Sequence, residues 1–382
     1  MKLFLIAGEP SGDRLGAALM AGLKTLAPGV VFAGVGGPAM QAEGLESIFP
    51  MEELSVMGLA EVLPKYRQLK RRIAETAAEV LRVAPDALIT IDSPDFCLRV
   101  ARQVRAGRPN QRTVHYVAPS VWAWRPGRAK KMAPLIDHVL ALLPFEPPYM
   151  EAAGMSCDFV GHPVVAEPSA SVAEAEAFRA AHGLGAAPLL LVLPGSRKGE
   201  VGRLAPRFGA ALAPVLAARP DLRLVLPTVP HVAPLVRKLT ADWPARPLIV
   251  EAPGEKRAAF RAAQGALAAS GTVSLELAAN QVPMVIAYDF NWLSRAIIWR
   301  LAKIDTVTLV NLVTESRTIP EFLGHDCTPE RIAPAVAALL DDGAARDAQL
   351  KAMADCMRAL GQGGEPPGLR AAKSVLAHLE VP

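Results

Sequence analysis

Residues 269–276 read Ala-Ser-Gly-Thr-Val-Ser-Leu-Glu. The small apolar residues 264–269 predict a short buried strand that ends in this stretch, and residues 275–279 predict the helix that follows. A strand that turns directly into a helix leaves backbone N–H groups unpaired, and Gly271 allows a ligand to approach them. Together with the positive end of the helix dipole, these groups form a candidate anion site. The alternative is an ordinary turn in which a Ser or Thr side chain caps the helix.

The same rhythm of short apolar runs and longer helical patterns extends along most of the chain. It is typical of βαβ units with parallel sheets, and 382 residues are more than one typical domain holds. We therefore predict an α/β fold with two Rossmann-like, doubly wound domains that face a cleft. The rhythm breaks near residues 161–163, so we expect domains at 1–163 and 164–345. The helical pattern at 346–382 is a further segment, and its last helix can cross back to the first domain.

Composition narrows the class of protein. The net charge of +4 and the pI near 8.9 are compatible with anionic substrates or a membrane surface and do not require nucleic acid. The cysteines are far apart and lack metal-ligand spacing, which indicates reduced structural thiols of a cytoplasmic protein. No apolar run approaches the roughly 18 residues that span a bilayer, and the first apolar run is too short for a signal peptide. The four cysteines are Cys97, Cys157, Cys327 and Cys356.

Residues 57–81 predict a basic amphipathic helix. Apolar residues recur at helical spacing, and five cations lie within residues 65–72. Such a helix suits contact with a membrane surface or acyl chains, although an ordinary surface helix with its apolar face on a sheet has the same pattern. Pro64 predicts that the helix begins as two pieces. The candidate membrane or acyl-chain residues are Met57, Leu59, Val62, Leu63, Tyr66 and Leu69.

Residues 89–96 read Ile-Thr-Ile-Asp-Ser-Pro-Asp-Phe and place two carboxylates just after an apolar strand. The carboxyl ends of parallel strands are where doubly wound sheets bind their ligands. We interpret Asp92 as a candidate general base. Asp95 follows a turn that contains proline and can instead cap the next helix, yet the sequence does not exclude it as the base.

Two further turns follow strands. Residues 8–13 have the position of a ligand-binding loop without the usual glycine spacing, and in residues 193–200 the guanidinium of Arg197 matches phosphate oxygens. Glu276, about one turn into its helix, can accept hydrogen bonds from sugar hydroxyls. An aromatic and basic segment at 115–125 suits a ring or an acyl chain, and residues 318–323 can add another wall. The candidate nucleotide-sugar residues are Ser11, Gly12, Ser196, Arg197, Ser270, Gly271, Thr272 and Glu276.

With these residues laid out, the chain resembles the lipid-A-disaccharide synthase family of Gram-negative bacteria over nearly its whole length. The resemblance is carried by short motifs in the right order, at residues 7–13, 36–44, 51–58, 91–96, 115–125, 143–146, 194–197 and 270–272. It implies a GT-B fold, inversion at the sugar, and neither a metal nor another cofactor. It also implies transfer from UDP-2,3-diacylglucosamine to 2,3-diacylglucosamine 1-phosphate, with Asp92 as the base and Arg197 on the diphosphate.

The resemblance further implies a peripheral position on the inner membrane, with docking through residues 57–69, and a homodimer that exchanges C-terminal segments. Pro64 stands where the family pattern has glycine. Two other functions fit parts of the sequence: a soluble enzyme using UDP-N-acetylglucosamine (a 2-epimerase or a peptidoglycan-type transferase), and a non-catalytic periplasmic binder. A water-soluble substrate gives the basic apolar helix no purpose, and the missing signal peptide counts against the binder.

Overall fold

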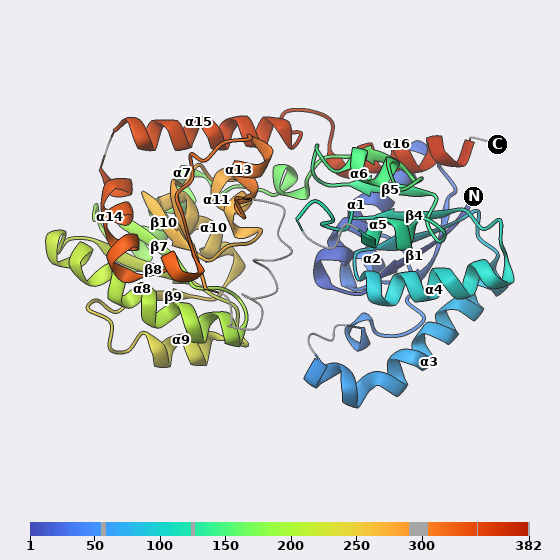
Figure 1. Ribbon diagram of the computed structural model, residues 1–382, viewed down its shortest axis with the longest axis horizontal. Coiled ribbons are helices and arrows are strands. Elements are labelled where there is room, and N and C mark those ends of the chain that lie inside the picture. Colours follow the sequence, from blue (N-terminus) through green and yellow to red (C-terminus); the bar gives the residue numbers. More distant parts are fainter. Residues whose placement is uncertain (55–58, 124–126, 290–304, 342, 381–382) are drawn as a thin grey trace. The chain divides into compact units, whose positions relative to one another are not determined.

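The apolar runs form the strands of two parallel sheets in a computed structural model of the chain, which describes residues 1–382 except 55–58, 124–126, 290–304, 342 and 381–382 (Figure 1). The chain divides into two compact units. The first contains Met1–Ala166 and Leu360–Pro382, and the second contains Glu167–Ala359. Each sheet has six strands with helices packed around it, so the fold class is α/β with two doubly wound sheets.

In the first unit the strand order is β2-β1-β3-β4-β5-β6. The strands are β1 (Lys2–Ala7), β2 (Val31–Val35), β3 (Ala87–Ile91), β4 (Thr113–Tyr116), β5 (His138–Ala141) and β6 (Ser156–Phe159). The helices are α1 (Pro10–Leu26), α2 (Pro38–Ala42), α3 (Leu59–Val83), α4 (Pro94–Gly107), α5 (Gly127–Met132), α6 (Pro147–Glu151) and α16 (Pro367–Glu380), with 3-10 turns at Met51–Glu53 and Pro163–Ala166.

In the second unit the strand order is β12-β11-β10-β7-β8-β9. The strands are β7 (Leu189–Leu193), β8 (Arg223–Pro227), β9 (Leu248–Val250), β10 (Gly265–Ala268), β11 (Met284–Tyr288) and β12 (Glu321–Leu323). The helices are α7 (Val172–Ala181), α8 (Lys198–Ala218), α9 (Ala233–Leu239), α10 (Pro253–Ala262), α11 (Val273–Ala279), α13 (Leu309–Val313), α14 (Pro329–Leu340) and α15 (Ala344–Ala359), with a 3-10 turn at Gly324–Asp326.

Each sheet has one point where the strand order reverses. In the first unit it lies between β1 and β3, and in the second it lies between β7 and β10. Loops that follow two such strands run in opposite directions and open a crevice, which is where doubly wound sheets bind ligands. The loops at 8–13 and 92–95 flank the first reversal, and the loops at 194–197 and 269–272 flank the second. The topology therefore brings the sequence motifs together in pairs.

Helix α16 belongs to the first unit although it is the last element of the chain (Figure 1). It packs on α1 so closely that glycine is needed on both helices. A Cβ atom at Gly22 would lie 2.7 Å from the Gly368 carbonyl oxygen, and one at Gly368 would lie 2.5 Å from the Ala18 carbonyl oxygen. Helix α15, in contrast, packs on α11 and α13 and belongs to the second unit.

The local structure differs from the sequence analysis in two respects. Helix α3 is one continuous helix over Leu59–Val83, so Pro64 does not divide it. The proline lies in the second turn, where its missing N–H removes a single hydrogen bond close to the helix end. Strands β6 and β12 were not expected from the sequence, because both are short edge strands with little buried apolar surface. Within the described residues, none of the helices combines the length and the apolar character that crossing a membrane requires.

Candidate functional site

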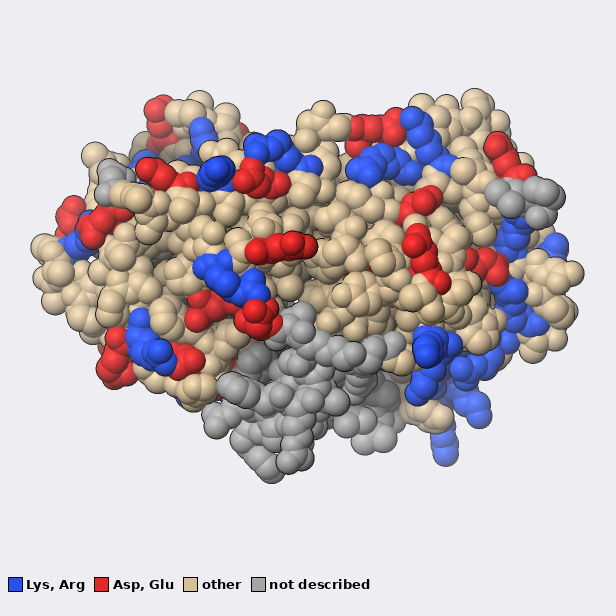
Figure 2. Space-filling model, turned by 45° about the horizontal axis from the view of Figure 1, so that its top comes forward, with Lys and Arg blue, Asp and Glu red and all other residues tan. Residues whose placement is uncertain are grey.

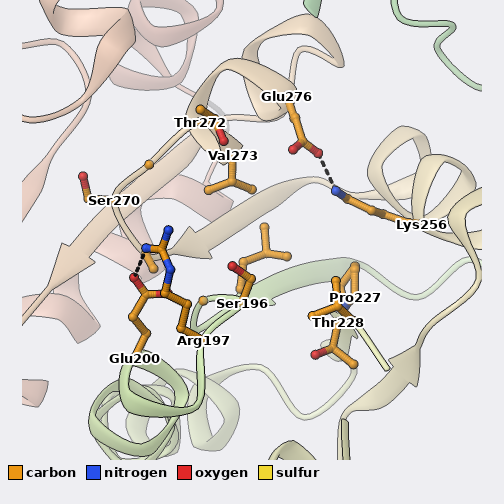
Figure 3. Close-up of a pocket in the computed structure, with 15 residues that line it drawn as sticks. Ser196, Arg197, Glu200, Pro227, Thr228, Lys256, Ser270, Thr272, Val273 and Glu276 are labelled. Atoms are coloured by element: carbon orange, nitrogen blue, oxygen red, sulfur yellow. Dashed lines mark hydrogen bonds and ion pairs between the residues drawn. The ribbon is translucent and has the colours of Figure 1, made fainter. Parts of the chain in front are cut away.

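The loops beside the second reversal point line a pocket of about 400 Å³ in the second unit (Figure 3). Residues from the ends of β7, β8 and β10 and from the starts of α8, α10 and α11 meet there. Six of the eight candidate nucleotide-sugar residues line this one pocket: Ser196, Arg197, Ser270, Gly271, Thr272 and Glu276. The beginning of α8, a helix of 21 residues, adds the positive end of its dipole.

The turn after β7 holds Arg197 at the rim of the pocket. Gly195 has a φ of 113°, and a Cβ atom there would lie 2.8 Å from the Oε2 atom of Glu200, so the turn depends on glycine. Glu200 is 13% exposed; its Oε1 atom accepts hydrogen bonds from Arg197 Nη1 at 3.2 Å and from the Tyr288 hydroxyl at 3.1 Å. The Arg197 side chain itself is 62% exposed. It is therefore oriented by one carboxylate and still accessible to an anionic ligand.

The turn after β10 is not a capped helix start of the ordinary kind. Thr272 occupies the N-cap position, but its side chain makes no capping hydrogen bond. The Ser274 hydroxyl instead donates to the Gly271 carbonyl at 2.9 Å, and this hydrogen bond within the turn stabilises it. Gly271 has a φ of 151°, and a Cβ atom there would meet no heavy atom within 4 Å. The turn thus leaves open space beside Ser270 and Thr272 on the pocket wall.

Three polar lining residues were not singled out from the sequence: Lys256, Thr228 and Glu200. Lys256, on α10, donates to Glu276 Oε2 at 2.5 Å, and Figure 3 shows this pair on a different wall from Arg197 and Glu200. The Thr228 Oγ1 atom is buried and finds no hydrogen-bond partner among the described residues, so a ligand hydroxyl or amide would satisfy it. Thr228 directly follows β8, and its position at a strand end was the available signal. For Lys256 the sequence offered none.

The first unit has its own cavity, of about 610 Å³, between α3 and α4 and beside the first reversal point. Asp92 and Asp95 both line it, together with the apolar residues Leu54, Leu69, Ile73 and Phe96 and the cations Lys70, Arg99 and Arg102. Asp92 is half-buried, and its backbone N–H donates to the Tyr116 carbonyl at 2.9 Å. Asp95 is exposed in the first turn of α4. The arrangement provides a carboxylate at the edge of an amphipathic cavity.

The backbone at Asp92 is strained. Asp92 and Ser93 have φ values of 53° and 42°, a left-handed conformation that costs about 1 to 3 kcal/mol for a residue with a side chain. The adjacent β1 loop accommodates this turn, because a Cβ atom at Gly8 would lie 2.7 Å from the Ser93 hydroxyl oxygen. Strain of this kind persists where the surrounding structure holds it and is frequent at reactive sites.

Ser11 and Gly12 do not line the pocket of the second unit. They lie in the first turn of α1, in the first unit, with Ser11 exposed and Gly12 buried. The neighbouring Asp13 has a structural role: its buried carboxylate accepts hydrogen bonds from the backbone N–H groups of Gly37, Ala39 and Met40 at 2.8 to 3.0 Å. It thereby joins the glycine-rich turn before α2 to α1.

Helix α3 has a buried core face and, at Tyr66, an exposed aromatic side chain. Ile73, Ala77 and Val80 are buried in the core of the first unit, whereas Tyr66 is 52% exposed and Leu69 is partly buried. Arg72 is not a free surface cation, because it bonds to Glu53 at 2.8 Å and lies over the Phe49 ring. Among the other candidates, Met57 lies outside the described residues, as do the side chains of Leu59, Val62 and Leu63.

The aromatic segment after β4 is anchored by a buried acid. Glu146 accepts hydrogen bonds from the Trp122 indole at 3.1 Å and from the Leu142 and Leu143 N–H groups. Burial raises the pKa of Glu146 to about 7 despite these donors. Trp122 also meets the Phe145 ring edge-on at 5.1 Å. The segment is thus fixed to the 143–146 turn; Trp124 and Arg125 lie outside the described residues.

Comparison with known proteins shows which family the chain is similar to. A sequence model described as lipid-A-disaccharide synthetase matches residues 3–366. A lipid-A-disaccharide synthase of Ruegeria pomeroyi is 65% identical, covering 99% of this chain and 96% of that protein. One of Rhodospirillum centenum is 50% identical, covering 98% and 94%. A UDP-GlcNAc 2-epimerase structure from Neisseria meningitidis, bound to UDP-GlcNAc, has a TM-score of 0.66 at 11% identity and 99% coverage of both chains; this likeness shows the GT-B type of fold alone.

Proposed function

We propose that this chain, which belongs to the lipid-A-disaccharide synthetase family, joins UDP-2,3-diacylglucosamine to 2,3-diacylglucosamine 1-phosphate and releases UDP. Membership makes it a glycosyltransferase. The observation that supports the two substrates best is that the two reversal points carry different chemical groups. The one in the second unit has hydrogen-bond donors suited to phosphate, and the one in the first unit has a carboxylate beside an apolar cavity.

In this proposal the second-unit pocket binds the UDP part of the donor. Its diphosphate would contact Arg197 and the backbone and hydroxyl donors of the two turns. Charge grows on the diphosphate as the bond to the sugar breaks, so donors already in place stabilise the transition state more than the ground state. Glu276, held by Lys256, would accept hydrogen bonds from the sugar hydroxyls.

The acceptor sugar would occupy the first unit. Asp92 removes the proton of the attacking hydroxyl, the oxygen forms a bond to the anomeric carbon, and UDP leaves from the opposite face. This sequence inverts the anomeric centre. A carboxylate base within hydrogen-bond reach of an alcohol contributes about 10²- to 10⁴-fold in rate. Ser11 and Gly12, in the first turn of α1, remain candidate contacts of the UDP-sugar.

Two further parts of the proposal concern the surroundings of the enzyme. The acylated substrates imply peripheral binding to the cytoplasmic face of the inner membrane through the leading end of α3, where Tyr66 is exposed. A homodimer that exchanges C-terminal segments would form the α16–α1 contact between two chains, as in domain swapping. Size-exclusion chromatography with light scattering measures the second point directly.

The deciding experiment incubates the purified protein with UDP-2,3-diacylglucosamine and 2,3-diacylglucosamine 1-phosphate and follows disaccharide and UDP by mass spectrometry. A parallel arm supplies UDP-N-acetylglucosamine alone or with the same acceptor. We expect disaccharide only with the acylated donor. Epimerisation or transfer with UDP-N-acetylglucosamine as the better donor would replace this proposal with the soluble-substrate alternative.

A further inference from the structure

The first-unit cavity can bind more of a ligand than one sugar hydroxyl, because both acidic and basic side chains line it, at different positions. Glu9, Asp92 and Asp95 line it near the ends of β1 and β3. Lys70 on α3 and Arg99 and Arg102 on α4 line it elsewhere. Asp95, Arg99 and Arg102 are four and three residues apart on α4, so the two arginines lie about 6 Å and 10 Å beyond Asp95 along the helix axis.

These three cations have no ion-pair or hydrogen-bond partner among the described residues. Their situation differs from that of nearby cations. Arg72 is paired with Glu53 and Glu75, and Arg105 is paired with Asp137 and bonds to Thr113. Figure 2 shows Lys and Arg side chains gathered along the lower edge of the first unit. Cations that converge on one cavity without partners favour an anionic ligand.

The form of the cavity narrows the ligand further. Its apolar wall is formed by Leu54, Leu69, Ile73 and Phe96, and its acidic end would repel an anion. A ligand that fits must therefore be amphipathic and must carry its negative charge away from the group that meets Asp92. Arg99 and Arg102, one helical turn apart, are suited to a phosphate monoester, whose oxygens accept paired guanidinium hydrogen bonds.

We propose that Arg99, Arg102 and Lys70 bind the 1-phosphate of the acceptor sugar, so that its attacking hydroxyl meets Asp92 at the other end of the cavity. This inference rests on the proposed function and adds the specificity residues of the acceptor side. The phosphate then orients the sugar, and the apolar wall receives part of an acyl chain. The phosphate of a membrane phospholipid has the same chemistry, and the test separates the two sources.

The test compares acceptors with and without the 1-phosphate at saturating donor, for the wild type and for Arg99→Gln and Arg102→Gln. We expect each variant to raise KM for the phosphorylated acceptor about 10- to 100-fold, since each removes hydrogen bonds to a charged group. The value of kcat, and KM for the donor and for the acceptor without phosphate, should stay unchanged. Arg99→Lys, which keeps the charge, should recover part of the loss. Arg108→Gln, an exposed arginine at the end of the same helix and outside the cavity, is the matched control.

Three outcomes would overturn the inference without touching the proposed function. Equal losses with both acceptors would show that the arginines do not contact the phosphate. If the Arg99→Gln and Arg102→Gln variants lose binding to phosphatidylglycerol vesicles but keep the wild-type preference for the phosphorylated acceptor, the cations bind a membrane lipid instead. Wild-type transfer to both acceptors with equal KM would remove the phosphate site while leaving the proposed function intact. A wild type that forms no disaccharide with either acceptor would instead remove the proposed function, and this inference with it.

Discussion

At the scale of single residues, the most informative position is Asp92, because its backbone is left-handed and the residue lines the first-unit cavity. Its left-handed φ is tolerated by Asp and Asn better than by other residues with side chains. Asn can therefore replace Asp92 without changing the turn. This permits a test of the carboxylate alone.

We expect Asp92→Asn to lower turnover by about 10²-fold or more while the affinity for UDP and the melting temperature stay unchanged. Steady-state rates and calorimetric titration with UDP measure these quantities. Asp95→Asn is the matched control and should keep most of the activity, because Asp95 lies exposed in the first turn of α4. If the two variants exchange their effects, Asp95 is the base.

Glu276 tests the sugar side of the second-unit pocket. Replacing it with Ala removes the partner of Lys256 and the expected acceptor of the sugar hydroxyls. The affinity for the UDP-sugar should fall by roughly tenfold, and that for UDP should fall less. Glu255→Ala is the control. It removes an acid that precedes Lys256 on α10 but pairs with His182 outside the pocket, so both affinities should stay unchanged. If the affinity for UDP falls more than the affinity for the UDP-sugar, Glu276 contacts the nucleotide instead of the sugar.

At the scale of elements, α16 is held to the sheet by a polar network that depends on pH. His138 shares hydrogen bonds with Ser156 and Ser374, and Ser374 also donates to Asp158. The His378 ring stacks on His138 at 4.8 Å. Burial lowers the pKa of His138 to about 4, with a smaller contribution from His378, while Asp158 acts in the opposite direction. The pKa of His378 is lowered too, mainly by burial, with Arg112 adding to it and Asp137 and Asp158 opposing it.

The sign of the pH effect follows from these values. An unfolded histidine takes up a proton near pH 6.5, whereas folded His138 does so only near pH 4. The stability of the docked helix is therefore complete above pH 6.5 and falls as the pH decreases toward 4. Hydrogen exchange of α16 amides should accelerate between pH 6.5 and 5, relative to the intrinsic rate, before ordinary carboxylates titrate. His138→Gln should reduce this dependence to the part that His378 contributes, and the exposed His231→Gln should leave it unchanged. Constant protection across the range would contradict the assignment.

The same scale shows how far the sequence alone could go. The central strands, such as β3 and β7, were predicted correctly because both of their faces are buried and nearly all of their residues are apolar. The edge strands β6 and β12 have no such signal. The pocket residues after β7 and β10 were found because each turn is local to one strand end. Thr228 follows β8 and Lys256 lies on α10, and both join the pocket only through the order of the strands.

At the scale of the whole molecule, the proposed attachment to membranes combines charge with apolar contact. The chain has a net charge of +4, and its described helices contain no candidate for a membrane span. In our proposal, binding to a membrane surface rests on the leading end of α3. The serine triple variant Met57→Ser, Leu59→Ser, Leu63→Ser should release the protein from anionic vesicles in a flotation assay.

High salt should weaken, without abolishing, the binding of the wild type, because screening removes only the electrostatic part. Tyr149→Ser, which changes an exposed aromatic residue on α6, serves as the control. If the triple variant floats with the vesicles as the wild type does, the leading end of α3 is not the attachment site.

The position of α16 in the first unit also has a consequence for biosynthesis. A ribosome makes the chain from its first residue, so the whole second unit emerges before the helix that completes the first. Throughout that interval the nascent first unit lacks the helix that covers Ala18 and Gly22 on α1. Its folding can finish only after α16 has left the ribosome, and a message cut short before residue 360 would yield a product whose first unit lacks this helix.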